Sequence, residues 1–232
     1  MRALLPALLL FLAAPAAAAD NWNGEASLTG SKTTGNTDTL DIGAALRLRE
    51  QDGVWRHKFR LSADYGEARS TQNKERFRVG HQVERTVSDR LFVFGDLNGF
   101  YDGFGPFREG YFVGGGLGYT VLEDEPTTWD LTGGIGYRSQ KASDDTTQEE
   151  VALRLASDFD WTINDKVAVN MDSEALIADS DDYLWNEIGL TSTLMGSLAA
   201  RASFRVDYHS EVPEGRVSTD TITRFGLVYT ID

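Results

Sequence analysis

Apolar and polar residues alternate along almost the whole sequence after residue 19, and this period-two pattern constrains the fold more than any other feature. Phe59 and Leu61, for example, lie on either side of Arg60. Residues two apart point to the same face of a β-strand, so the pattern indicates strands with one apolar and one polar face. A chain of such strands without helix-period segments is typical of a transmembrane β-barrel, whose lipid-facing and lumen-facing side chains alternate.

We therefore predict an all-β fold, a transmembrane antiparallel up-and-down β-barrel of about twelve strands. The expected strands are 22–29, 40–49, 55–65, 74–84, 91–101, 111–121, 129–137, 151–163, 167–177, 184–194, 198–208 and 221–231. An even number of strands places both ends of the barrel domain on one side. The connections on that side are tight, and most of those on the other side are longer, such as 66–73, 102–109, 141–148 and 211–218. Short periplasmic turns and longer outer loops are usual in bacterial barrels.

Residues 1–19 are expected to form a signal peptide that is removed during export. Arg2 supplies a positive start, the segment 4–12 is largely apolar, and Ala17-Ala18-Ala19 resembles a signal-peptidase cleavage site. The apolar run is too short to span a bilayer as a helix, which needs roughly 20 apolar residues. The sequence thus predicts export through the periplasm and a single barrel domain over residues 20–232 in the outer membrane.

The composition narrows the classes of function. The chain has a net charge of −14 at pH 7, which argues against a nucleic-acid partner because such partners require a basic surface. It contains no cysteine, so it has neither thiol chemistry nor disulfides. We expect no cofactor and a monomer whose partners are the outer-membrane lipids and lipopolysaccharide.

Tryptophans and tyrosines lie at opposite ends of the expected strands. Trp22, Trp55, Trp129 and Trp161 fall at the expected periplasmic ends of strands. Five tyrosines fall at the opposite ends: Tyr65, Tyr101, Tyr111, Tyr137 and Tyr208. Tryptophan and tyrosine concentrate at membrane–water interfaces because each ring has an apolar body and a polar tip. The sorting favours a membrane barrel over a soluble β-sandwich.

Several segments resemble the salt-induced outer membrane protein family, which is built around a domain of unknown function. They are 22–28 (WNGEASL), 33–37 (TTGNT), 55–58 (WRHK), 63–66 (ADYG), 89–91 with 94–95, and 210–213 (SEVP). The resemblance implies an outer-membrane barrel of Gram-negative bacteria and supplies no catalytic residues. Gly226, Tyr229 and Ile231 also resemble the C-terminal signature that the barrel-insertion machinery recognises, although Ile231 stands where an aromatic residue is usual.

Strand parity predicts a charged lumen with two sectors. The basic candidates for the lumen wall are Arg47, Arg49, Arg56, Lys58, Arg60, Lys74, Arg76 and Arg78. The acidic candidates, from strands on the opposite wall, are Asp130, Asp158, Asp160, Asp172 and Glu174. Twelve strands about 4.8 Å apart and tilted near 40° give a backbone diameter of roughly 24 Å, and long side chains leave a gap of about 10 Å or none.

The sequence leaves the role of this lumen open. An open lumen would be a narrow channel for small polar or zwitterionic solutes or ions, and the family resemblance connects it with salt or envelope stress. A closed lumen would be a salt-bridged core of a structural envelope protein, because buried charges must find partners. The four loop carboxylates Asp144, Asp145, Asp181 and Asp182 are weak candidates for divalent cations, which prefer oxygen ligands.

An outer-membrane lipid-modifying enzyme is a further alternative, which the sequence does not favour. His81 has lipid-facing parity, as have Ser173, Asn186 and Ser192, but these residues lie on distant strands and no G-x-S-x-G motif is present. A bulge or a dimer contact would account for His81, and Trp185 departs from the apolar parity of its strand, which also suggests a bulge. Twelve glycines between residues 95 and 136 suggest a tight bend in the barrel wall.

Overall fold

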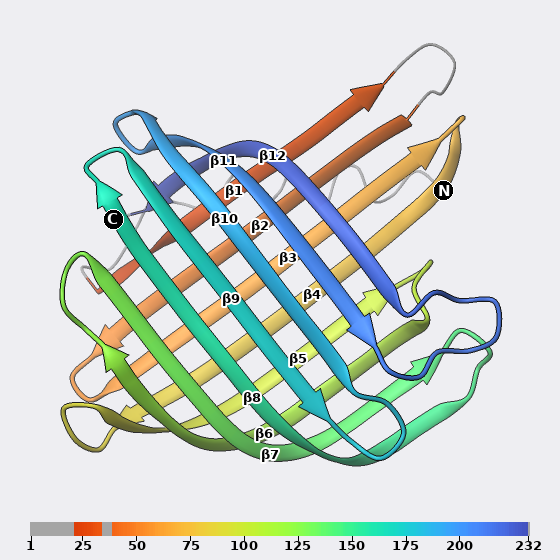
Figure 1. Ribbon diagram of the computed structural model, residues 1–232, viewed down its shortest axis with the longest axis horizontal. Coiled ribbons are helices and arrows are strands. Elements are labelled where there is room, and N and C mark those ends of the chain that lie inside the picture. The colour runs from red at the N-terminus through yellow and green to blue at the C-terminus, as the bar shows by residue number, and fades with distance from the viewer. Residues whose placement is uncertain (1–20, 34–38, 232) are drawn as a thin grey trace.

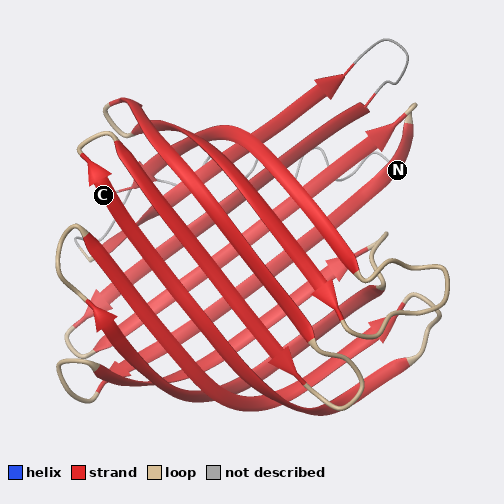
Figure 2. Ribbon diagram, in the orientation of Figure 1, coloured by secondary structure: helices blue, strands red, loops and turns tan. Residues whose placement is uncertain are grey.

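The computed structural model describes residues 21–33 and 39–231 as one closed antiparallel barrel (Figures 1 and 2). The strands are β1 (Trp22–Thr33), β2 (Thr39–Asp52), β3 (Trp55–Ala68), β4 (Thr71–Thr86), β5 (Leu91–Asp102), β6 (Phe107–Leu122), β7 (Thr127–Ala142), β8 (Thr147–Asn164), β9 (Val167–Ile177), β10 (Tyr183–Met195), β11 (Leu198–His209) and β12 (Thr219–Ile231). The fold class predicted from the alternation is confirmed. The expected signal peptide lies outside the described residues.

Every strand pairs with its neighbour in the sequence, and β1 pairs with β12 to close the barrel. The closing register places Gly24 opposite Ile231 and Thr29 opposite Gly226. Closure pairs Gly24–Thr29 with Gly226–Ile231, and a bilayer favours such pairing because lipid tails offer no hydrogen bonds. No helix in the described part of the chain is long and apolar enough to cross a membrane.

The connections on the two rims of the barrel differ less in length than the sequence suggests. The turn-side rim carries the connections 53–54, 87–90, 123–126, 165–166 and 196–197, whereas the loop-side rim carries 69–70, 103–106, 143–146, 178–182 and 210–218. The expected long loop at 66–73 is wrong, because β3 and β4 continue to a two-residue turn at Arg69–Ser70. Both turn residues have positive φ, 52° and 61°, as the two-residue hairpin turns that match strand twist require.

Large apolar side chains cover the outer face of the barrel. Ile135, Val151 and Phe225 are each about two-thirds exposed, at 66%, 68% and 66%. A water-soluble protein buries side chains of this size, whereas in a membrane barrel they contact lipid. The polar face of every strand therefore points into the lumen, and the search for function begins there.

The glycine-rich wall of β6 and β7 makes room for neighbouring backbone and for inward-facing aromatic rings. A Cβ atom on Gly116 would lie 2.1 Å from the carbonyl oxygen of Gly133, and one on Gly118 would lie 2.0 Å from the ring of Phe92. The ring of Phe112 lies in the same way against Gly114 and Gly136. Both strands curve strongly along the lower edge of the barrel (Figure 1). The glycines therefore accompany a bend, as expected, and they also allow phenylalanines to occupy part of the lumen.

Candidate functional site: the charged lumen

Ion pairs cross the lumen in its turn-side half. Arg47 on β2 lies 3.1 Å from Asp172 on β9. Arg60 and Lys58 on β3 lie 3.5 and 3.8 Å from Asp158 on β8. These strand pairs are far apart in the strand order of the barrel, so their side chains meet across the interior. The opposite walls are thus within salt-bridge distance of each other at this level.

A buried cation anchors this turn-side network. The Nζ atom of Lys58 lies 2.6 Å from Glu84, and its side chain is only 5% exposed. Arg56 donates a hydrogen bond to the same carboxylate at 3.1 Å and lies 3.9 Å from Asp130. The members that reach across the lumen are wetter, since the side chain of Arg60 is 40% exposed. The network therefore has a buried part on β3 and β4 and a hydrated part that faces the lumen.

The remaining predicted lumen residues have diverse surroundings. Lys74 lies 2.6 Å from Asp41, and Glu174 lies 2.6 Å from Arg154. Arg49 and Asp160 are exposed and form no ion pair within the described ranges. The predicted sectors therefore contribute both paired and unpaired charges.

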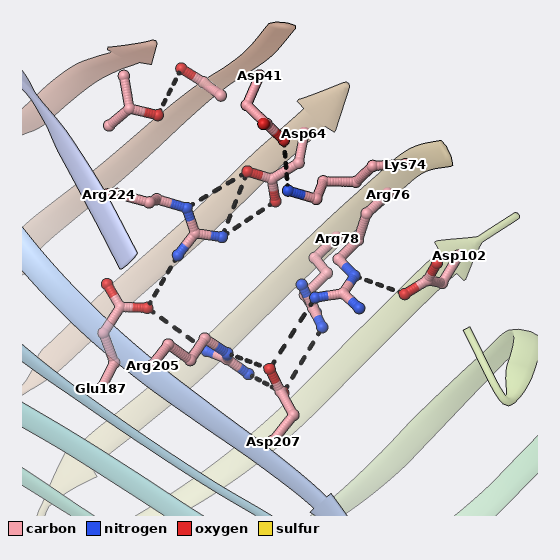
Figure 3. Close-up of polar contacts among 12 residues, drawn as sticks. Asp41, Asp64, Lys74, Arg76, Arg78, Asp102, Glu187, Arg205, Asp207 and Arg224 are labelled. Atoms are coloured by element: carbon pink, nitrogen blue, oxygen red, sulfur yellow. Dashed lines mark hydrogen bonds and ion pairs between the residues drawn. The ribbon is translucent and has the colours of Figure 1, made fainter. Parts of the chain in front are cut away.

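A second cluster occupies the loop-side half of the lumen, and Figure 3 shows most of its charged members. Arg205 on β11 donates hydrogen bonds to both carboxylate oxygens of Asp207, at 3.0 and 2.8 Å. Tyr183 on β10 donates to Asp207 at 2.5 Å. The guanidinium of Arg205 also stacks on the indole of Trp185, 4.1 Å from the ring centre. Arg205 and Asp207 are thus held rigidly from two strands.

Two further guanidiniums from β4 approach the same carboxylate (Figure 3). Arg76 lies 3.9 Å and Arg78 3.7 Å from Asp207. Arg76 also contacts Asp102 at 2.5 Å and Asp220 at 3.7 Å. Three guanidiniums therefore converge on one carboxylate, and only that of Arg205 is within ordinary hydrogen-bond distance of it.

Arg224 links this cluster to the opposite wall. Its guanidinium lies 3.1 Å from Asp64 on β3 and 3.6 Å from Glu187 on β10. Glu187 in turn lies 3.7 Å from Arg205. The loop-side cluster thus extends around the lumen from β3 and β4 to β10, β11 and β12.

The loop-side cluster lines one part of a cavity inside the barrel, and the lining also includes Arg47, Arg60, Asp158 and Asp172 of the turn-side half. The cavity has a volume of about 280 Å³, and its lining includes Arg76, Arg78, Trp185, Asp207 and Asp220. Binding cavities for small molecules begin at roughly 300 Å³, so this one suits a small solute. One nitrogen of Arg76, Nη1, is buried there without a hydrogen-bond partner in the described structure.

Sequence reasoning missed several of the basic residues in the lumen. Five arginines outside the predicted basic sector form ion pairs in the interior: Arg138, Arg154, Arg201, Arg205 and Arg224. Strand parity could have identified them, because each lies an even number of residues from an inward-facing neighbour on its strand. Basic charge therefore occurs around the whole lumen, and the two-sector description is incomplete.

The loop carboxylates already have partners within the protein. Asp181 is 1% exposed and lies 2.6 Å from Nδ1 of His209 and 3.8 Å from Arg138. Burial opposes ionisation of Asp181, but contacts with His209, the Glu211 amide and Arg138 outweigh it and hold the pKa of this carboxyl below its usual value.

The other three loop carboxylates make local contacts. Asp145 pairs with Arg108 and Lys141, at 3.2 and 2.9 Å. Asp144 accepts a hydrogen bond from the Thr146 amide, and Asp182 accepts one from the Ala178 amide. Within residues 21–33 and 39–231, no group of three or more His, Cys, Asp or Glu residues is placed to hold a metal ion.

Polar residues on the lipid face pair with one another. Nδ1 of His57 lies 3.2 Å from Nε2 of His81, and Asn186 donates to Ser173 at 2.6 Å. The bulges suggested for His81 and Trp185 are wrong, because β4 and β10 keep a regular register at both positions. Trp185 instead faces the lumen, where Arg205 covers its ring.

The fold and the charged lumen define a closed barrel of the outer-membrane type. The family model described as "Protein of unknown function, DUF481" matches residues 26–231, and the chain therefore belongs to this family. No curated protein shows significant sequence similarity to the chain.

Two solved structures illustrate the likeness of the fold. The NanC porin is 10% identical, with a TM-score of 0.54 over 88% of this chain and 98% of that one. An outer membrane channel from Pseudomonas putida F1 is 8% identical, with a TM-score of 0.51 over 90% of this chain and 95% of that one. At such low identity the likeness establishes the barrel fold alone.

Proposed function

We propose that this protein is an outer-membrane barrel whose lumen forms a narrow channel for small polar solutes or ions. The observation that carries the proposal is the internal cavity, which is lined by charged side chains from opposite walls. Porins and channels among the similar folds support the same class of function. A non-enzymatic role fits this class, and the family resemblance connects it with salt or envelope stress.

The hydrated ion pairs of the turn-side half set the conductance in this proposal. The side chains of Arg47 and Arg60 are 36% and 40% exposed, and ion pairs so accessible to water contribute only about 0–1 kcal/mol. Such pairs open and exchange partners readily. A small ion can therefore pass by replacing one partner of a pair for a short time.

Single-channel recording in a planar bilayer tests the proposal. We expect small, discrete conductances for the folded protein. Asp158→Asn removes the carboxylate shared by Lys58 and Arg60 and should enlarge the conductance about twofold or more, with a shift towards anions. Arg49→Gln is the matched control, since it neutralises a lumen arginine that has no ion pair and should shift selectivity without enlarging the pore.

A structural envelope protein is the second candidate function, and it has its own supporting observation. Arg154 is 3% exposed and lies 3.0 Å from Asp96 and 2.6 Å from Glu174, as buried ion pairs in a closed core would. If folded wild-type protein and Asp158→Asn both fail to conduct at either polarity, the channel is excluded and this second function stands.

Orientation and partners complete the proposal. The protein is a monomer among outer-membrane lipids and lipopolysaccharide, with the loop-side rim outside the cell. A peptide tag inserted after Asp145, in the connection between β7 and β8, should be accessible to antibody on intact cells. A tag inserted after Asp165, in the turn between β8 and β9, should become accessible only after the outer membrane is permeabilised. The reverse pattern would invert the topology.

A further inference from the structure

We infer that the loop-side part of the lumen cavity is a binding site for a small zwitterion, whose carboxylate contacts Arg78 and Arg76 and whose cationic group contacts Asp220. The inference rests on the proposed channel function, since the ligand would be the solute that the lumen admits. It depends on three features of this part of the cavity: unused donors, an unused acceptor and a cluster in which carboxylates slightly outnumber guanidiniums.

The unused donors belong to Arg78 and Arg76. In the described structure, the only ion pair of Arg78 is a 3.7 Å contact with Asp207, which is beyond hydrogen-bond distance. A guanidinium carries five N–H donors in a planar fork that matches a carboxylate. Nη1 of Arg76, beside Arg78, is buried without a hydrogen-bond partner. Two neighbouring guanidiniums thus present free N–H groups to one cavity.

The carboxylate of Asp207 is already largely used by other donors. Arg205 donates two hydrogen bonds to it and Tyr183 donates a third. Stacking on Trp185 holds Arg205 in place, so rearrangement of this pair would break several contacts at once. A carboxylate supplied by a ligand would instead reach Arg78 directly.

The unused acceptor is Asp220 on β12. Its side chain is 41% exposed, and its one ion-pair contact in the described part of the chain is with Nη2 of Arg76 at 3.7 Å. Arg76 therefore contacts both Asp207 and Asp220, and Arg78 approaches the same Asp207. A ligand that carries both charges can contact Arg78 and Asp220.

The balance of charge favours a zwitterion over a simple anion. The cluster joins Arg76, Arg78, Arg205 and Arg224 with the carboxylates of Asp64, Asp102, Glu187, Asp207 and Asp220. The carboxylates are no fewer than the guanidiniums, so an added anion gains little from the cluster as a whole. A zwitterion leaves the total charge unchanged and still pairs both unused groups.

Calorimetric titration of the detergent-solubilised barrel tests this inference independently of conduction. The probes are glycine, β-alanine and 4-aminobutyrate, which separate the two charges by increasing lengths, with acetate, ethylammonium and glycerol for comparison. We expect one of the amino acids to bind at least tenfold more tightly than acetate or ethylammonium. Equal binding of acetate would overturn the zwitterion in favour of a simple anion site, and no binding of any probe would overturn the site.

Variants test which residues bind the ligand. Arg78→Gln and Asp220→Asn should each weaken binding of the best amino acid about tenfold or more, whereas Arg78→Lys should retain part of it because it keeps the charge. Arg49→Gln in the turn-side half is the control and should bind as the parent does. Retention of the heat-modifiable gel mobility of a folded barrel shows that a variant is folded. Unchanged binding in folded Arg78→Gln and Asp220→Asn would overturn the assignment.

The two proposals fail in different ways. Binding without any conductance would refute the channel and leave the site in place. Conductance without binding would refute the zwitterion site and leave the channel in place. If both hold, the best amino acid should reduce the potassium chloride conductance of the parent in a saturable way and should have at least tenfold less effect on Arg78→Gln.

Discussion

The two halves of the lumen both contain arginine–carboxylate ion pairs, but these pairs differ in their exposure to water and in their position. In the turn-side half, hydrated pairs such as Arg60–Asp158 cross the interior at 3.5 Å. In the loop-side half, Arg205 and Asp207 form a drier pair, with side chains 10% and 6% exposed, beside an open cavity. The comparison teaches that ion pairing alone does not close a barrel. In the loop-side half the closest pair lies along one wall, and Arg76 and Arg78 reach across to it only at 3.9 and 3.7 Å.

The buried cation between the two halves offers the strongest test of this comparison. Arg154→Met should reduce the free energy of unfolding by about 3–5 kcal/mol, because Asp96 and Glu174 would remain buried without a counter-charge. Urea titration of the refolded barrel measures the change. Arg154→Lys keeps the charge and should lose less. A loss below about 1 kcal/mol for Arg154→Met would mean that the carboxylates are hydrated and that no dry layer separates the halves.

Removal of one carboxylate from each half compares the two kinds of ion pair directly. Asp207→Asn should destabilise the barrel by about 3 kcal/mol, since it leaves the buried Arg205 with only a 3.7 Å ion pair to Glu187. Asp158→Asn should cost less than about 1 kcal/mol, since water reaches Arg60 and Asp158 and the buried Lys58 keeps its closer partner Glu84. The same urea titrations measure both values. Equal losses would remove the distinction between a dry wall pair and a hydrated crossing pair.

Substitutions in the glycine-rich wall of β6 and β7 change packing without changing charge. Gly116→Val should cost about 1–3 kcal/mol, because its side chain would meet the backbone of β7. Gly133→Ala is the matched control, since a Cβ there would lie 3.4 Å from the side chain of Leu155, in ordinary contact. The change in urea midpoint measures each effect. If both substitutions were tolerated equally, close strand approach would not explain the glycines.

The smallest expected effect is a local response to acid at the loop-side rim. The pKa of Asp181 is lowered in the folded protein, so its contribution is complete above the unfolded pKa, about 3.9, and is lost as the pH falls through the folded value. Amide exchange in residues 178–182 should therefore accelerate below about pH 4. Asp181→Asn should remove this step, whereas Asp145→Asn, at the exposed rim, should keep it. Exchange that stays independent of pH in the parent, after correction for intrinsic rates, would contradict the assignment.

The sequence by itself determined which face of each strand a side chain occupies. Arg60, Arg76 and Asp158 lie on the polar face because side chains alternate with a period of two, and this rule needs only local geometry. The same rule predicted the closed antiparallel barrel. It went wrong at 66–73, where polarity suggested a loop but the backbone continues as paired strand to Arg69–Ser70.

Only the tertiary structure decided which charges meet. Arg224 and Asp64 are 160 residues apart in the chain, and Arg201 and Glu25 are 176 apart. Their contacts depend on how far the strands are staggered when β1 closes on β12, and on the width that this stagger gives the lumen. Period-two alternation contains neither quantity. The hydrated crossing pairs and the cavity beside Arg78 follow from closure of the barrel, which brings opposite walls of the lumen together.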